Sequence, residues 1–176
     1  SHGDEEVFPR EQFVQWFDLA HITPSAAQFN TEKLNWLNAH YIKAADDARL
    51  AGEIRKRLAA QGVTVGDHPD PAQVAALYKE RVATLNELAD AALLFYRPPV
   101  RDPALLAEHL QGASREAVRL FGERAAAVTW DRVSLNGLIK QIVAELKLKL
   151  PQVAVPLRVA VTGRTQTPSI DAVLEL

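Results

Sequence analysis

The chain has 176 residues, of which 48% are hydrophobic and 24% charged, a balance typical of globular proteins. It contains no cysteine, so disulfides and thiolate zinc sites are excluded, and its net charge of −2 argues against holding nucleic acid by bulk electrostatics. The sequence has neither an apolar run long enough to span a bilayer nor a signal-peptide pattern. We therefore expect a cytoplasmic protein without a membrane partner.

Helical signals follow one another along the first half of the chain. Apolar residues recur at helical spacing, and prolines or good N-caps stand where each run begins. Gly62 is a typical C-terminal signal, and Pro98-Pro99 stops the last run. The predicted helices are one that begins at Pro9, one over 30–45, one over 46–61 and one long helix over 71–95.

Three further helices are predicted over 103–110, 114–127 and 134–148. The segment 153–163 leaves two alternatives open. Its valines and Leu157 alternate with other residues, which is strand periodicity and is slightly favoured on that ground alone. Pro156 at a first helical turn and Gly163 as a C-cap would instead bound a helix.

Sequence motifs of catalysis are missing. The chain has no phosphate-binding glycine loop, no G-x-S-x-G, no H-E-x-x-H and no EF-hand loop. Its five histidines do not show the spacing of metal ligands. We therefore predict no catalytic residue, no metal and no cofactor in this chain, and interpret it as a binding module.

Two arginines stand out from this pattern. Arg81 borders the apolar stripe of the predicted long helix, and Arg158 lies between Leu157 and Val159. The simplest explanation is a side chain whose stem packs while its head reaches water. A guanidinium held by apolar neighbours also keeps its planar donors in place, which suits recognition of RNA bases or phosphates. A helical protein-interaction module without an RNA role remains the alternative.

Three blocks of the sequence carry a resemblance to a known family: SHGDEEVFPREQFVQWFDL, FNTEKLNWLNAHYIK and PLRVAVTGRTQTPSIDAVLEL. In content, order and spacing they resemble the C-terminal half of the bacterial glutamyl-tRNA synthetases. The resemblance implies an all-α protein and a helix at 156–162 instead of a strand. It also implies a stem-contact segment over 1–46, a first anticodon-binding helical subdomain over 47–98 and a second over 99–176.

The resemblance also implies a partner and a parent enzyme. The partner would be glutamate-specific tRNA, with no role for DNA, and the chain would be a monomer. The family's catalytic domain would lie before Ser1, and the family continues past Leu176, so we expect a fragment that is inactive alone. The full-length parent would attach glutamate to its tRNA with ATP and Mg²⁺.

Site residues carry over from the family one position at a time. Arg81 in KERVATL matches an arginine that contacts the third anticodon base, and Arg158 in PLR matches one that contacts the first. The turn after Thr162-Gly163 also contacts anticodon bases in the family. The predicted anticodon-binding residues are thus Arg81, Arg158, Thr167, Pro168 and Ile170, and the predicted stem contacts are Lys33 and Lys43.

Overall fold

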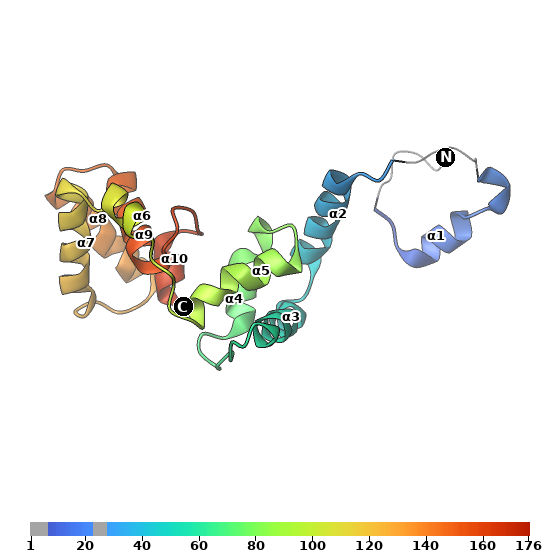
Figure 1. The fold of residues 1–176 in the computed structure, drawn as a ribbon, viewed down its shortest axis with the longest axis horizontal. Coiled ribbons are helices and arrows are strands. Elements are labelled where there is room, and N and C mark those ends of the chain that lie inside the picture. Colours follow the sequence, from blue (N-terminus) through green and yellow to red (C-terminus); the bar gives the residue numbers. More distant parts are fainter. Residues whose placement is uncertain (1–6, 23–27) are drawn as a thin grey trace.

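The computed structural model describes residues 7–22 and 28–176, and that part of the chain is helical without a strand, which confirms the all-α fold class. The helices form an elongated molecule with α1 at one end and two groups of packed helices beyond it (Figure 1). Residues 1–6 and 23–27 of the expected stem-contact segment lie outside the described residues. The helices are α1 (Arg10–Trp16), α2 (Thr31–Ala44), α3 (Asp47–Ala60), α4 (Pro71–Tyr78), α5 (Leu85–Ala92), α6 (Pro103–His109), α7 (Gly112–Ala125), α8 (Arg132–Glu145), α9 (Leu150–Thr162) and α10 (Ile170–Glu175), with short 3-10 turns η1 (Leu19–His21), η2 (Lys79–Arg81) and η3 (Leu93–Phe95).

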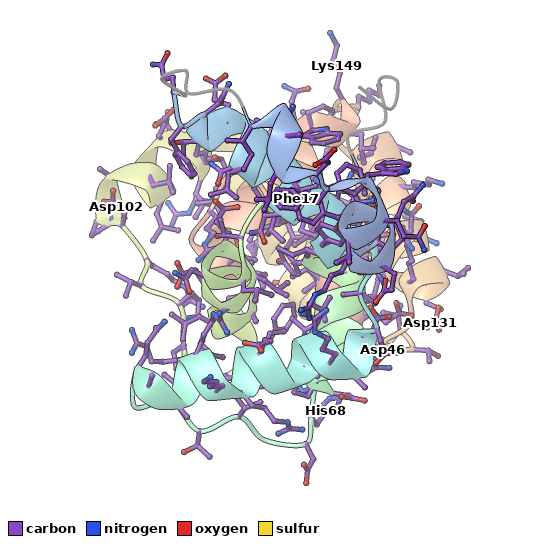
Figure 2. The ribbon with its side chains drawn as sticks, turned by 90° about the vertical axis from the view of Figure 1, so that its right-hand side faces the viewer. Phe17, Asp46, His68, Asp102, Asp131 and Lys149 are labelled. Carbon is purple, nitrogen blue, oxygen red and sulfur yellow. The ribbon has the colours of Figure 1, made fainter. Side chains whose placement is uncertain are left out.

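Side-chain caps set the starts of most of these helices. The Asn30 side chain accepts a hydrogen bond from the Lys33 backbone N–H at 3.0 Å, as its predicted N-cap role requires. Asp46, Asp102 and Asp131, labelled in Figure 2, cap α3, α6 and α8 in the same way. Each cap satisfies backbone N–H groups that have no partner inside the helix.

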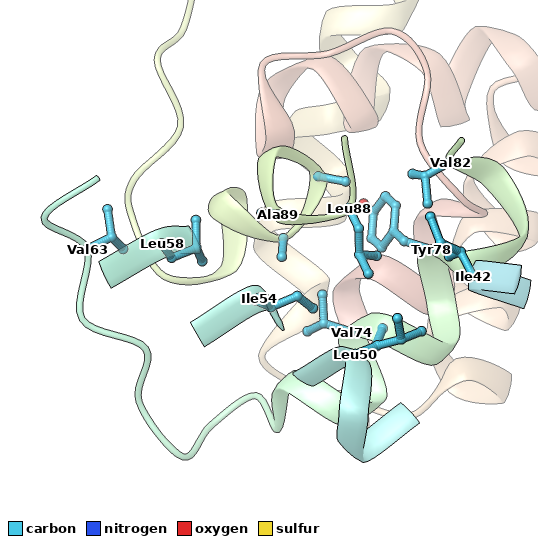
Figure 3. Close-up of a cluster of buried hydrophobic side chains, with 13 residues drawn as sticks. Ile42, Leu50, Ile54, Leu58, Val63, Val74, Tyr78, Val82, Leu88 and Ala89 are labelled. Carbon is cyan, nitrogen blue, oxygen red and sulfur yellow. The ribbon is translucent and has the colours of Figure 1, made fainter. Parts of the chain in front are cut away.

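The middle group of helices packs around a first hydrophobic core, shown in Figure 3. Leu50, Ile54 and Leu58 form the predicted apolar stripe of α3 and are almost fully buried. They meet side chains from α2, α4 and α5, because the amphipathic helices must remove their apolar faces from water. We call the first core the buried set Ile42, Leu50, Ile54, Leu58, Val63, Val74, Ala75, Tyr78, Val82, Leu88, Ala89, Ala91 and Ala92.

The last helices pack around a second hydrophobic core. It draws on α7, α8, α9 and α10, and an ion pair between Arg124 and Glu145 joins α7 to α8. Leu77 and Phe95 are partly buried against both cores. We call the second core the buried set Ala117, Leu120, Phe121, Ala125, Leu135, Leu138, Ile139, Ile142, Val153, Leu157, Ile170 and Val173.

The predicted long helix over 71–95 is wrong. α4 ends at Tyr78, Val82 is extended, and α5 begins only at Leu85. The break has a local cause in the sequence Thr84-Leu85-Asn86-Glu87. The Glu87 backbone N–H donates to Thr84 Oγ1 at 3.1 Å, and the Glu87 carboxylate accepts from the neighbouring Ala83 N–H at 2.8 Å. This reciprocal capping starts a new helix in the middle of an apolar repeat.

The helix predicted at 156–162 is confirmed and is longer than expected. α9 begins at Leu150, so Pro156 lies inside it instead of at its start. A proline there leaves the carbonyl four residues earlier, that of Gln152, without its helical partner. The Ser114 hydroxyl on α7 donates to this carbonyl at 3.0 Å, which explains how the helix continues through Pro156.

Candidate nucleic-acid interface

Arg81 lies in the turn η2, which corrects its predicted setting in a long helix. Val82 follows it, only 9% exposed, and fastens the turn to the first core. The Arg81 side chain is exposed, and within residues 7–22 and 28–176 no hydrogen bond or ion pair holds its guanidinium. Its donors are therefore free for a ligand.

Arg158 lies on α9 and is half-buried between Leu157 and Val159, both of which are buried. Its Nε donates to Thr167 Oγ1 at 2.8 Å, and its Nη1 donates to the Thr165 carbonyl at 3.2 Å. These bonds fix the plane of the guanidinium, and no group in the described part of the chain accepts a hydrogen bond from its Nη2. Burial lowers the pKa of Arg158, and the positive charge of Arg81 lowers it further.

The turn after α9 is built on Gly163 and Thr162. Gly163 has φ of +68°, the left-handed conformation that ends many helices, and its N–H donates to the Val159 carbonyl at 2.9 Å. Thr162 is buried, and its hydroxyl donates to the Arg158 carbonyl at 2.7 Å and accepts from the Arg164 N–H at 3.2 Å. The turn therefore places Thr167 against the Arg158 guanidinium.

Three arginines from two separate helix groups lie near enough to Tyr78 for their charges to act on its hydroxyl. We call them the arginine cluster: Arg81, Arg158 and Arg164. Tyr78 is 5% exposed, and its hydroxyl is buried without a hydrogen-bond partner among the described residues. Burial raises the pKa of Tyr78 to about 12, and the positive charges of the arginine cluster partly offset that rise. The cluster is thus a local concentration of positive charge on a chain that is acidic overall.

The predicted residues of the turn fall into two kinds. Thr167 is half-buried, and its hydroxyl donates to the Pro168 carbonyl at 2.8 Å while it accepts from Arg158. Pro168 is buried, and Ile170 is 3% exposed within the second core. A direct contact by these last two side chains therefore has no support here, since both are covered by protein. Their buried side chains hold the turn in place instead.

Lys33 and Lys43 both lie on α2 and are exposed. Lys43 forms an ion pair with Glu80 at 3.4 Å, and the Asn38 side-chain amide donates to the Ala83 carbonyl at 2.6 Å. Both contacts join α2 to the segment that carries Arg81. Lys43 is therefore near the arginine-bearing turn, whereas Lys33 stands at the first turn of α2.

Sequence reasoning missed Arg164 and the contact between α2 and η2. Arg164 follows the Gly163 C-cap, and its Nη2 donates to the Asp90 carbonyl of α5 at 3.0 Å. Its position directly after the T-G pair was the available signal. The contact between α2 and η2 depends on tertiary packing, and no local sequence pattern around Asn38 indicates it.

The described residues contain no cluster of three His, Asp or Glu side chains that could bind a metal ion. Nor does the described part of the chain contain a helix with the length and apolarity that crossing a membrane requires. The chemistry of the site is instead that of arginine donors and threonine hydroxyls, which suits the acceptors of phosphates and unpaired bases.

Comparisons with known proteins agree with this chemistry. A family model described as an anticodon binding domain matches residues 49–176. The glutamate–tRNA ligases of Azoarcus sp. (strain BH72) and Aromatoleum aromaticum are 60% and 61% identical over the whole chain, which covers 38% of each relative. The chain thus spans less than half the length of these relatives.

A solved structure shares the fold. The crystal structure of a glutamate tRNA ligase from Elizabethkingia meningosepticum, in complex with its amino acid, superposes with a TM-score of 0.78. The superposition covers 97% of this chain and 34% of that one at 21% identity. Together with the family match, it confirms the resemblance found in the sequence blocks: the chain belongs to the family of anticodon-binding domains and corresponds to that region of bacterial glutamate–tRNA ligases.

Proposed function

We propose that this chain binds glutamate tRNA through the anticodon, as the RNA-binding part of a glutamate–tRNA ligase. One observation carries the proposal: Arg81, beside the first core, and Arg158, beside the second, both lie with Arg164 near enough to Tyr78 for their charges to act on its hydroxyl. A helical protein-interaction module gives no reason for this convergence. An anticodon loop does, because its unpaired bases expose acceptors at close spacing.

We assign the third anticodon base to Arg81. Glutamate anticodons end in cytosine, whose pairing edge offers two adjacent acceptors, O2 and N3, beside the N4 amino group, while glutamine anticodons end in guanine, whose pairing edge offers two adjacent N–H groups beside the single acceptor O6. The exposed N–H donors of Arg81 match the two adjacent acceptors of cytosine. On guanine they would face N–H groups at the corresponding positions, which is unfavourable. By analogy with bidentate base contacts, such a match is worth about 1–3 kcal/mol of discrimination.

We assign the first anticodon base to Arg158. Its guanidinium is already fixed by the two bonds to the turn, so little side-chain freedom is lost when a base arrives. The Thr167 hydroxyl stands beside it as a further polar group. Pro168 and Ile170 support this contact by holding the turn, and Lys33 and Lys43 would contact the RNA stem with their exposed ammonium groups.

The remaining expectations concern the whole protein. We propose that the parent is a cytoplasmic, monomeric enzyme that attaches glutamate to tRNA with ATP and Mg²⁺ bound outside this chain. Within the chain we keep the division into a stem-contact segment over 1–46 and helical subdomains over 47–98 and 99–176. Recognition by a few placed donors explains how a chain with a net charge of −2 can bind RNA.

The test is a binding titration of this chain with glutamate tRNA. The comparison RNA is the same tRNA with its three anticodon bases replaced, so that shape and phosphate charge are unchanged. We expect at least roughly tenfold tighter binding of the glutamate anticodon, since each correct base contact contributes about 1–3 kcal/mol. Equal affinity for the two RNAs would contradict anticodon recognition.

A further inference from the structure

At the junction between the two helix groups, Gly163 lies against the backbone of the linker at Pro99 and Val100. A Cβ atom added at Gly163 would stand 2.5 Å from the Val100 carbonyl oxygen and 3.9 Å from Pro99 Cβ. Real Cβ atoms do not approach other heavy atoms that closely, and Val100 meets Gly163 with its backbone, which cannot rotate away as a side chain can. Only glycine fits between α9 and the linker at this distance.

Residues on either side of Gly163 are fastened to different helix groups. Thr162 is hydrogen-bonded to the Arg158 carbonyl within α9, on the side of the second core. Arg164 reaches across to α5 and donates to the Asp90 carbonyl at 3.0 Å, on the side of the first core. Gly163 therefore lies at the point where the two groups are held at a fixed distance.

The junction borders solvent on one side. A cavity of about 240 Å³ lies beside Gly163 and is lined by Leu93, Pro99 and Arg164, among others. Val100 itself is 85% exposed, so the linker is not buried in either core. Leu77 and Phe95 also join the two groups by packing against both cores, whereas at Gly163 the linker backbone itself approaches α9, so this contact limits how closely the groups can lie.

We infer that Gly163 is a positioning residue for anticodon recognition: its missing side chain lets the two helix groups close to the spacing at which Arg81 and Arg158 contact one anticodon. The inference rests on the proposed function. Arg81 moves with the first core and Arg158 with the second, so any widening of the junction separates the two guanidinium groups. A displacement of about 1 Å at a binding or reacting group can cost up to about a hundredfold.

The test is Gly163→Ala in this 176-residue chain, with Gly62→Ala as its matched control. Gly62 has φ of +73° and no atom within 4 Å of an added Cβ, so its substitution strains the backbone in the same way but meets no neighbour. The chain has no native cysteine, so labels at Lys56→Cys on α3 and Gln141→Cys on α8 report the distance between the groups by pulsed electron paramagnetic resonance.

We expect Gly163→Ala to shift or broaden the distance distribution and to weaken binding of a glutamate tRNA transcript roughly tenfold to a hundredfold. Gly62→Ala should lower the thermal midpoint without either effect. An unchanged distance, or a shifted distance with unchanged affinity, overturns the inference. Should Gly163→Ala fail to fold, Pro99→Gly loosens the same junction from its other side and must broaden the distances and weaken binding, or the inference fails.

Arg158→Ala, measured alongside, separates this inference from the proposed function. If Arg158→Ala weakens tRNA binding while Gly163→Ala does not, anticodon recognition stands and the positioning role is lost. If Arg158→Ala binds tRNA as tightly as the wild type, the proposed function fails and the positioning role fails with it.

Discussion

The two helix groups present their arginines in different ways. Arg158, from the second group, is half-buried and hydrogen-bonded to Thr165 and Thr167 before any ligand is present. Arg81, from the first group, is exposed on a short turn, and no described residue holds its guanidinium. The Arg158 guanidinium is thus held in place before any ligand is present, whereas the Arg81 guanidinium is not.

This difference has an energetic consequence. A fixed guanidinium loses little conformational entropy on binding, so it contributes mainly to affinity. A free guanidinium loses side-chain conformational entropy on binding, at a cost of up to about 1.5–2 kcal/mol for arginine. Hydrogen bonds to the base offset this cost only when the base offers matching acceptors. We therefore expect Arg158 to govern how tightly tRNA binds and Arg81 to govern which tRNA binds.

Substitutions in the two hydrophobic cores test whether the two helix groups are separate structural units, and we expect them to have the largest effect on stability. Leu88→Ala in the first core and Leu135→Ala in the second each remove a fully buried side chain, at a cost of about 2–5 kcal/mol. We expect each substitution to speed amide hydrogen exchange mainly in its own group. Equal acceleration in both groups would mean that the chain unfolds as one unit and would contradict the proposed division near residue 98.

A second prediction concerns the Tyr78 hydroxyl beneath the arginine cluster. Burial raises its pKa from 10.0 to about 12, so the folded state favours the neutral phenol. The corresponding stability is present below pH 10 and is lost as the pH rises through about 12, by up to about 3 kcal/mol. Tyr78→Phe should remove this loss.

The measurement is denaturant unfolding of wild type and Tyr78→Phe below pH 10 and near pH 12. Tyr96, whose pKa burial also raises to about 12, is present in both proteins and cancels in the comparison. Tyr78→Phe should also be no less stable than wild type below pH 10, because it removes a buried hydroxyl without a partner among the described residues. The same pH-dependent loss in both proteins would show that Tyr78 is not the group responsible.

Arg158→Ala should weaken tRNA binding by roughly 10- to 100-fold, the effect of losing a charged hydrogen bond worth about 1.5–3 kcal/mol. The fold should persist, since the guanidinium is half-buried and bonds only to its own turn. Arg119→Ala is the matched control: it removes the same charge from an exposed arginine of α7 that pairs with Glu116 and Glu123. If both variants lose affinity equally, only net charge matters.

Arg81→Gln should change selectivity more than affinity. An amide carries both a donor and an acceptor, so it can pair with either base edge. We expect the affinity ratio between glutamate tRNA and the same tRNA with guanine as its third anticodon base to shrink by roughly 10- to 100-fold. In the parent enzyme, the ratio of catalytic efficiencies should shrink likewise. An unchanged affinity ratio would show that Arg81 does not recognise the third anticodon base.

Local sequence signals predicted much of the helical framework, but they misled where tertiary packing or a second capping signal decided the structure. Asn30 and Gly163 were placed correctly because capping depends on neighbouring residues alone. The alternation over 153–161 resembled a strand because α9 contacts α6, α7, α8 and α10, so apolar residues are needed on more than one face. In residues 71–95, continuous apolar periodicity concealed the Thr84–Glu87 cap that divides the helix.

The candidate site was less accessible from the sequence than the framework. Arg81 and Arg158 could be named through the family resemblance, but their meeting with Arg164 depends on how two cores pack, which no local pattern encodes. Ile170, carried over from the family as an anticodon contact, begins α10 with its side chain in the second core, and no local pattern around it indicates that position.

Base-by-base chemical probing of the anticodon shows which base each arginine contacts. The pairing edges of glutamate tRNA would be probed free and bound to wild type, Arg81→Ala or Arg158→Ala, at protein concentrations that saturate each variant. We predict that wild type protects the first and third anticodon bases, that Arg158→Ala exposes the first alone and that Arg81→Ala exposes the third alone. Loss of the same protections in both variants, or no protection of the anticodon by wild type, would contradict it.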